Sequence, residues 1–174
     1  MNVSRATRIQ AALIGLLALG LASAAFAAIQ PGSAPPDFTL NVATKGNINR
    51  PNDFRARKVI LLDVDHRACA PCRKVLGVMQ KLEKRHAGKG IQISPANSGG
   101  PLAERVVPKD TKDPRISFPV LLDRDYAVAG SCGVETIPSI VLGDTKGVAR
   151  LVHIGYQDDL EVRLTKLIDQ YRPK

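Results

Sequence analysis

The sequence predicts an α/β fold in which a central mixed β-sheet is flanked by helices. A continuous apolar run at residues 59–64 is typical of a strand buried on both faces. Apolar residues at helical spacing follow this run, and a second apolar segment at residues 91–93 completes a β-α-β unit. We expect its two strands to be parallel. Later in the chain, the pattern of an antiparallel hairpin precedes an amphipathic terminal helix.

The N-terminal segment has the features of a secretory signal peptide. Arg5 and Arg8 precede an apolar run at residues 11–21, which leads into Ala-Phe-Ala at 25–27, a small-x-small cleavage signal. We therefore expect residues 1–27 to be removed on export. An uncleaved membrane anchor is the alternative, because the apolar stretch is nearly long enough to span a bilayer.

The remaining residues, 28–174, have the size of one domain. The chain has 174 residues and is 44% hydrophobic, which is enough for one core and too little for two. Its net charge is +9, but the basic residues are scattered and aromatics are only 4%, so the sequence argues against nucleic-acid binding. We expect a monomer in the periplasm, tethered to the inner membrane if the N-terminal segment stays in place.

Short elements precede the central strand. Residues 29–36 are rich in Pro, Gly and Ala, which predicts an extended lead-in. A short strand is expected at 38–42, and the polar stretch at 44–52 predicts a turn or loop.

A helix is expected directly after the central strand. Its apolar residues recur at helical spacing, and Gly88 and Gly90 mark its end. Cys69 and Cys72 therefore lie at a strand-to-helix junction. The apolar positions of this helix are Val75, Val78, Met79 and Leu82.

The second half of the chain is less uniform. Residues 94–117 are rich in Pro, Gly and charge, and only 102–107 hint at a helix. The other expected elements are a strand at 118–123, a short helix at 126–131, hairpin strands at 140–142 and 148–154, and a helix at 158–171.

The Cys-Ala-Pro-Cys segment carries the chemistry that the sequence indicates. A cysteine at the start of a helix faces unpaired amides and the positive end of the helix dipole, which lowers the pKa of Cys69. Cys69 is then the exposed attacking thiol and Cys72 the buried resolving thiol. Pro71 fits the first helical turn, where its missing amide costs nothing.

Two other interpretations of the cysteine pair stay open. The pair could be half of a zinc site, which would need Cys132 and a histidine such as His66 to complete it. It could also be an inert surface disulfide. We expect neither a metal nor another cofactor.

Asp63 lies inside the most apolar run of the chain. Burial penalises the ionised form of a carboxyl group and raises its pKa. Asp63 could therefore take the proton from Cys72 during exchange. The simpler alternative is that it only hydrogen-bonds the end of a strand.

Residues 35–168 resemble the thioredoxin superfamily, and in particular the TlpA/ResA-like exported thiol-disulfide oxidoreductases of the redoxin (AhpC-TSA) group. The motifs that carry the resemblance are Ala-Pro-Pro-Asp-Phe-Thr-Leu at 34–40, Cys-Ala-Pro-Cys-Arg at 69–73, Phe-Pro-Val-Leu-Leu-Asp at 118–123 and Gly-Val-Glu-Thr-Ile-Pro-Ser at 133–139. The fold implied is thioredoxin-like.

The resemblance also implies site residues. Pro138 corresponds to a cis-proline that lies against the active-site disulfide, and the backbone of Ile137 pairs with the bound substrate segment. Ala70 and Pro71, between the two cysteines, are expected to contact the substrate. Asp63 matches the buried acid of thioredoxins.

The function implied is a periplasmic oxidoreductase that reduces disulfides of specific partner proteins, as in maturation of c-type cytochromes or a copper oxidase. A membrane-bound electron donor is a further expected partner. The chain departs from the family at Ala68, where a Trp is usual, and at Val75 and Gly77, where many members have Glu and Pro.

Two competing functions remain. A thiol peroxidase of the AhpC/TSA group shares the Pro-Asp-Phe-Thr-Leu motif, but His66 stands where that group places a hydroxyl residue. A Sco-like copper chaperone could use His66 and the two cysteines, with His153 later in the chain, although its cysteine spacing is one residue wider. Cys132 is either a buried apolar thiol or a third redox partner.

Overall fold

The computed structural model describes residues 28–43, 48–49, 58–103, 105, 107 and 116–174. The strands over these residues are β1 (Leu40–Val42), β2 (Ile48–Asn49), β3 (Val59–Asp65), β4 (Ile91–Asn97), β5 (Leu121–Leu122), β6 (Ser139–Gly143) and β7 (Ala149–Ile154). The helices are α2 (Ala70–His86), α4 (Ala127–Ser131) and α5 (Leu160–Tyr171), with a 3-10 turn, η2, at Gly100–Leu102.

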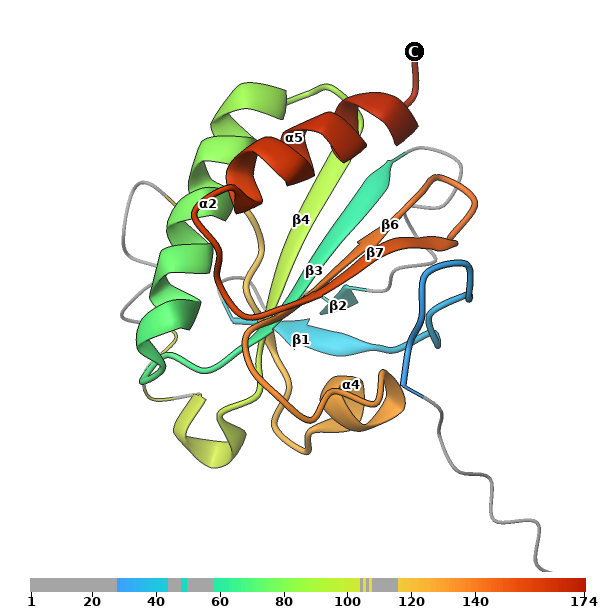
Figure 1. Cartoon of the computed structure of the whole chain (residues 1–174). Helices are drawn as coiled ribbons and strands as arrows, with labels where there is room; N and C mark the ends of the chain where they lie inside the picture. Colours follow the sequence, from blue (N-terminus) through green and yellow to red (C-terminus); the bar gives the residue numbers. More distant parts are fainter. Residues whose placement is uncertain (1–27, 44–47, 50–57, 104, 106, 108–115) are drawn as a thin grey trace, which may run out of the picture.

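The strands of the described residues form one sheet in the order β2-β1-β5-β4-β3-β6-β7. Strand β3 is parallel to β4 and antiparallel to β6, so the sheet is mixed. Helices α2 and α5 cover one face and α4 lies on the other (Figure 1). The predicted fold class is therefore confirmed. The expected signal peptide, residues 1–27, lies outside the described residues, and none of the described helices is long and apolar enough to cross a membrane.

Side chains of the central strand β3 alternate between two core layers. Leu61 packs in the layer that contains α2 and α5, whereas Leu62 and Val64 pack in the layer beneath α4. Because successive side chains of a strand point to opposite faces, Asp63 and Asp65 lie on the face of Leu61, below α2. The sheet therefore places two carboxyl groups beneath the helix that carries the cysteines.

Strand β4 is longer than the sequence predicted. It was expected to end at Ile93 but continues through Pro95 to Asn97, paired with β3 along its whole length. Proline is disfavoured in central strands because it lacks an amide donor. Within β4, only Ala96 and Asn97 pair with β5, so Pro95 lies where β4 has β3 as its single partner.

Two other expectations need correction. The strand expected at 118–123 is reduced to the two residues of β5. The stretch 44–52, expected to be a turn or loop, contains β2, which pairs with β1. The segment 94–117, for which the sequence gives only the hint of a helix at 102–107, contains the end of β4 and η2, and the described residues 103, 105 and 107 are helical.

Helix α2 begins at the cysteine pair. Cys69 is its N-cap residue, and Pro71 stands in the first turn, where no amide donor is required. The buried face includes Val75 and Met79, which pack on β3 and β4. Burying side chains of this size contributes about 1.5–3 kcal/mol each, which fixes the helix, and with it Cys69, relative to the sheet.

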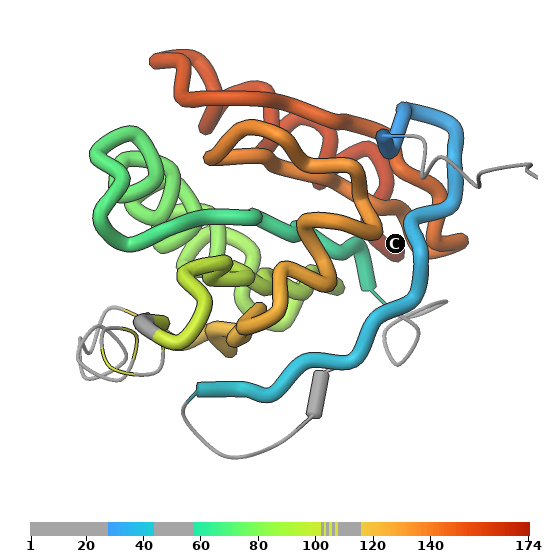
Figure 2. The backbone as a smooth tube through the Cα atoms, turned by 90° about the horizontal axis from the view of Figure 1, so that it is seen from below, coloured from blue at the N-terminus to red at the C-terminus, as the bar shows by residue number. Residues whose placement is uncertain are grey.

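The expected extended lead-in is hydrogen-bonded to the rest of the described structure. We call residues 28–33 the N-terminal strap. The Ile29 N–H donates a hydrogen bond to the carbonyl of Cys132 at 2.9 Å, and the Gly32 N–H donates to the carbonyl of Ala149 at 2.8 Å. Figure 2 shows the strap alongside β7. It thus joins the start of the domain to the loop that follows α4.

Candidate active site

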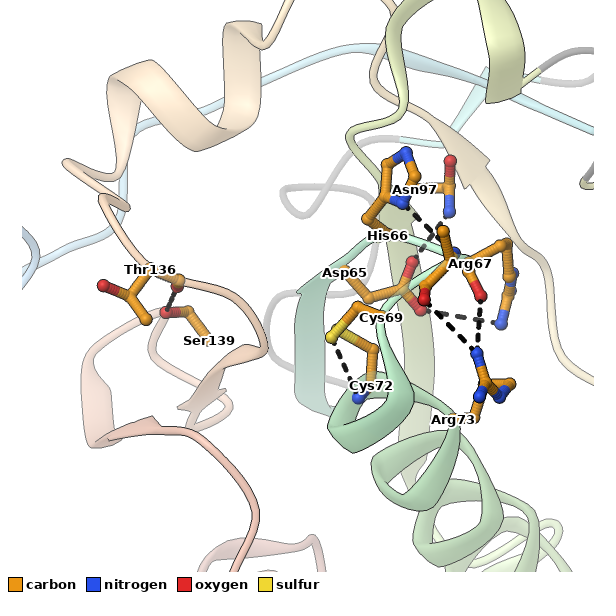
Figure 3. Close-up of a disulfide and its surroundings, with 10 residues drawn as sticks. Asp65, His66, Arg67, Cys69, Cys72, Arg73, Asn97, Thr136 and Ser139 are labelled. Atoms are coloured by element: carbon orange, nitrogen blue, oxygen red, sulfur yellow. Dashed lines mark hydrogen bonds and ion pairs between the residues drawn. A yellow bond between two sulfur atoms is a disulfide. The ribbon is translucent and has the colours of Figure 1, made fainter.

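Cys69 and Cys72 form a disulfide at the N-terminus of α2, with an S–S distance of 2.08 Å (Figure 3). The Cys72 N–H donates a hydrogen bond to the sulfur of Cys69 at 3.2 Å. Cys69 is half-buried, whereas Cys72 is only 2% exposed. The predicted strand-to-helix placement of the pair is confirmed, and Cys69 is the more exposed of the two residues.

Backbone and side-chain bonds fix the segment that enters the disulfide. The Cys69 N–H donates to the carbonyl of His66, and the Ala68 N–H donates to Nδ1 of the same histidine at 3.1 Å. From α2, Nη1 of Arg73 donates to the carbonyls of Arg67 and Ala68 at 3.3 and 3.4 Å. The loop before Cys69 is therefore tied to the helix after it. Ala70 and Pro71, the expected substrate contacts, are both exposed.

Asp63 lies below the helix and is fully buried. Its neighbours across the strands are Pro95 on β4 and Ile140 on β6, neither of which has a side-chain donor. Neither carboxyl oxygen accepts a hydrogen bond from the described residues. Burial raises the pKa of Asp63 well above its usual value, the charge of Asp65 raises it further, and Arg67 acts in the opposite direction. A strand-end hydrogen bond, the simpler alternative for this residue, is absent from the described part of the chain.

The Ile137–Pro138 peptide bond is cis, as the resemblance implied. Strand β6 begins directly after it, and Ser139 lies opposite Val64 of β3. Because β3 and β6 are antiparallel, the beginning of β6 and the end of β3 meet at one edge of the sheet. Pro138 and the cysteine pair therefore belong to the same edge.

Apolar side chains are exposed at this edge. Ile137 is 37% exposed and Ile154, at the end of β7, is 60% exposed. The Gly155 N–H donates a hydrogen bond to the carbonyl of Pro138 at 2.8 Å, which holds the end of β7 against the proline loop. This end of the sheet therefore exposes apolar side chains next to a loop that a backbone hydrogen bond holds in place.

The structure adds a polar cluster that the sequence analysis missed. Asp65 is buried, its Oδ1 accepts a hydrogen bond from Nδ2 of Asn97 at 3.0 Å, and its Oδ2 lies 3.6 Å from Nη1 of Arg67 (Figure 3). Asn97 reaches Asp65 because β3 and β4 pair in that register. One signal was visible in the sequence: Asp63 and Asp65 are two residues apart, the spacing that puts two side chains on the same face of a strand.

Cys132 is separate from the disulfide. It is fully buried in the core layer beneath α4, on the face of the sheet opposite to α2. Burial raises the pKa of its thiol. Its surroundings are those of a buried apolar thiol rather than of a third redox partner.

The metal interpretations find no ligand set in the described residues. Within residues 28–43, 58–103 and 116–174, no three His, Cys, Asp or Glu side chains converge so that they could hold a metal ion. His153, the later histidine that a copper chaperone would use, is buried on β7 opposite Ile140. The cysteines are joined to each other instead.

Known proteins share both the sequence pattern and the fold. The model of the AhpC/TSA family matches residues 31–152. The thioredoxin-like protein YneN of Bacillus subtilis is 31% identical over 129 residues, which cover 73% of this chain and 73% of that protein. The thiol-disulfide oxidoreductase ResA of Geobacillus kaustophilus is 28% identical over 142 residues, which cover 80% of this chain and 79% of ResA.

A solved structure agrees with these relatives. The thioredoxin domain of a thiol-disulfide oxidoreductase from Bacteroides vulgatus superposes with a TM-score of 0.68 at 24% identity, over 81% of this chain and 99% of that domain. The fold is therefore thioredoxin-like. Together with the family match, these similarities show that the chain belongs to the AhpC/TSA family and is a thiol-disulfide oxidoreductase.

Proposed function

We propose that the protein reduces disulfides of partner proteins in the periplasm, with Cys69 as the attacking thiol and Cys72 as the resolving thiol. The observation that carries this proposal is the unequal exposure of the two cysteine residues at one helix N-terminus. Cys69 is half-buried and its sulfur accepts the Cys72 N–H, whereas Cys72 is buried. A thiolate at Cys69 is stabilised by that amide and by the helix dipole.

The reaction proceeds in two exchanges. The Cys69 thiolate attacks one sulfur of the substrate disulfide, so that a Cys69–substrate disulfide forms and the other substrate sulfur leaves as a thiolate, which takes a proton from solvent. Cys72 then loses its proton and attacks the sulfur of Cys69. The Cys69–Cys72 disulfide forms, the second substrate sulfur leaves as a thiolate, and two electrons have passed to the substrate.

Asp63 is proposed as the base for Cys72. Its burial below α2 puts it on the side of the sheet that faces the buried cysteine. A general base works best when its pKa is close to the working pH, and the raised pKa of Asp63 moves it in that direction. No other described carboxyl group combines full burial with oxygens that accept no hydrogen bond.

The substrate segment is proposed to lie along the edge that Pro138 and Ile137 form beside the disulfide. The exposure of Ile137, Ala70 and Pro71 supports a contact of this kind. Specific partners suggested by the resemblance are apocytochrome c or a copper oxidase subunit, and a membrane-bound thiol donor would return two electrons to the Cys69–Cys72 pair after each cycle.

Trapping distinguishes the two thiols. The variant Cys72→Ser should accumulate a mixed disulfide with a model partner that contains one disulfide, because the resolving attack is lost, whereas Cys69→Ser should form none. Cys132→Ser serves as the matched control and should turn over normally. Trapping through Cys72 in the Cys69→Ser protein would overturn the assignment.

The direction of transfer is tested by the reduction potential of the Cys69–Cys72 pair. The protein is equilibrated in graded thiol-disulfide buffers, and free thiols are alkylated and mapped by mass spectrometry. A reductant should give a value near roughly −270 mV, as in thioredoxin, whereas a value near roughly −120 mV, as in DsbA, would make the protein an oxidant.

A further inference from the structure

Two carboxyl groups lie on one face of β3, beneath the helix that begins at the disulfide. Asp63 and Asp65 occupy alternate positions of β3 and both are fully buried. With a rise of about 3.3 Å per residue, their Cα atoms are roughly 6.6 Å apart on one face of the strand. At that separation, in a site from which water is excluded, the charge of one group acts strongly on the other.

The two groups have different surroundings. Asp65 has charged and polar partners, the guanidinium of Arg67 at 3.6 Å and the amide of Asn97 at 3.0 Å. Gly99 leaves room for that amide, since a Cβ at position 99 would come within 2.7 Å of the Asn97 Oδ1. These partners favour the ionised form of Asp65.

Asp63 has no such partners. Pro95 and Ile140 flank it, and its oxygens accept no hydrogen bond from the described residues. Its charge state therefore depends on burial and on the charges nearby. The nearby charges that act on Asp63 are those of Asp65 and Arg67. Both residues belong to the segment that leads into the disulfide.

No charged side chain on the other described elements around Asp63 is hydrogen-bonded to it. From α2, Arg73 is exposed and donates to the carbonyls of Arg67 and Ala68. From β7, His153 lies beyond Ile140, and burial lowers the pKa of its imidazole, which favours the neutral form. Asn97 of β4 is uncharged.

We propose that Asp65 is a positioning residue for the exchange reaction, whose negative charge, held in place by Arg67 and Asn97, makes Asp63 a stronger base toward the thiol of Cys72. The inference rests on the proposed role of Asp63. It places the control of that role on a second buried acid that does not itself touch the reacting sulfurs.

The first test measures Asp63 directly. Its carboxyl carbon is titrated by ¹³C NMR in the full domain, residues 28–174, as wild type and as Asp65→Asn. Removal of one negative charge, with Arg67 left in place, should lower the titration midpoint of Asp63 by about one pH unit or more. Asp144→Asn is the control, because Asp144 is also a buried acid paired with an arginine but lies in the β6–β7 turn; it should leave the midpoint unchanged. A folded Asp65→Asn protein with the wild-type midpoint would overturn the proposal.

A second variant, for which the titration midpoint of Asp63 should shift in the opposite direction, keeps the test decisive if Asp65→Asn does not fold. Arg67→Gln removes the positive charge and leaves that of Asp65, so the midpoint of Asp63 should rise. A fall or no change would contradict the proposal.

Kinetics separate this inference from the proposed function. The resolving step is followed as release of glutathione from a preformed Cys69–glutathione disulfide across pH. Its pH midpoint should move down in Asp65→Asn together with the NMR midpoint. If Asp63→Asn shows the same pH profile as the wild type, Asp63 is not the base and the proposed function fails at that point, while the NMR midpoints still decide whether Asp65 controls Asp63.

Discussion

The backbone amide of Cys72 donates a hydrogen bond to the sulfur of Cys69, 3.2 Å away, so the first turn of α2 would stabilise a thiolate at Cys69. In the proposed reaction, the residue that donates this hydrogen bond also displaces the substrate. In this proposal, Cys72 therefore provides both the hydrogen bond to the attacking sulfur and the resolving thiol.

This contact predicts unequal alkylation of the three cysteines. In the reduced protein at pH 6, iodoacetamide should modify Cys69 at least about tenfold faster than Cys132, because the thiolate is the reactive form and burial raises the pKa of Cys132. Peptide mass spectrometry after timed quenching measures the rates. In urea the three rates should converge, and equal rates in the folded protein would contradict the prediction.

The burial of Asp63 predicts that it destabilises the fold at neutral pH. Because its folded pKa is raised above the usual value of 3.8, its contribution to stability is fully present below that pH and is lost as pH rises through the folded value. Asp63→Asn should therefore be more stable than the wild type at pH 8, by about 1 kcal/mol or more, with a smaller difference at pH 5. Urea unfolding with the disulfide intact measures the difference.

Asp144 supplies the contrast for that experiment. Burial acts to raise the pKa of Asp144, but hydrogen bonds from the Val148 N–H and the Arg150 side chain outweigh it and lower the pKa. Asp144→Asn should destabilise the protein at neutral pH. Equal effects of the two substitutions would show that Asp63 has partners of its own.

Because His86 is buried, the protein should lose stability in mild acid. Burial lowers the pKa of this histidine, and Asp169, 3.8 Å away, acts in the opposite direction. The unfolded chain therefore takes up the proton first, and stability should fall as pH drops below about 6.5. His86→Gln should flatten this dependence between pH 7 and pH 5, and Asp169→Asn should steepen it. A slope unchanged by either substitution would exclude His86 as its source.

Two glycines should respond to alanine with opposite signs. Gly133 has φ of 61°, and a Cβ there would come within 2.4 Å of the Ala28 Cα in the N-terminal strap, so Gly133→Ala should destabilise the protein by about 1–2 kcal/mol or more. Gly77 lies inside α2 with nothing within 4 Å of its Cβ position. Gly77→Ala should stabilise by about 0.5–1 kcal/mol. Thermal unfolding of the two variants beside the wild type measures both effects.

The sequence predicted those parts of the site that local patterns encode. An apolar run followed directly by Cys-Ala-Pro-Cys is enough to place Cys69 at a helix N-terminus and to bury Asp63, because both facts depend on neighbours within a few residues. The cis bond at Pro138 came from resemblance, since no local pattern separates it from a trans proline.

Long-range register accounts for what was missed. The contact between Asp65 and Asn97 joins residues on different strands, and it depends on β4 continuing through Pro95, a residue that local rules assign to a loop. Composition likewise predicted only an extended lead-in at residues 29–36 and none of its contacts. The hydrogen bonds of these residues to Cys132 and Ala149 join positions more than 100 residues apart in the sequence, so no local pattern predicts them.

The N-terminal strap also has a practical consequence for how the protein is handled. An affinity tag or fusion partner placed immediately before Ala28 would start beside Gly133, on the loop that leads to Pro138. The C-terminus projects from the end of α5, at the opposite end of the molecule from α4 and the beginning of α2 (Figure 1). Purification handles and surface immobilisation should use Lys174, so that partner proteins can approach the disulfide unhindered.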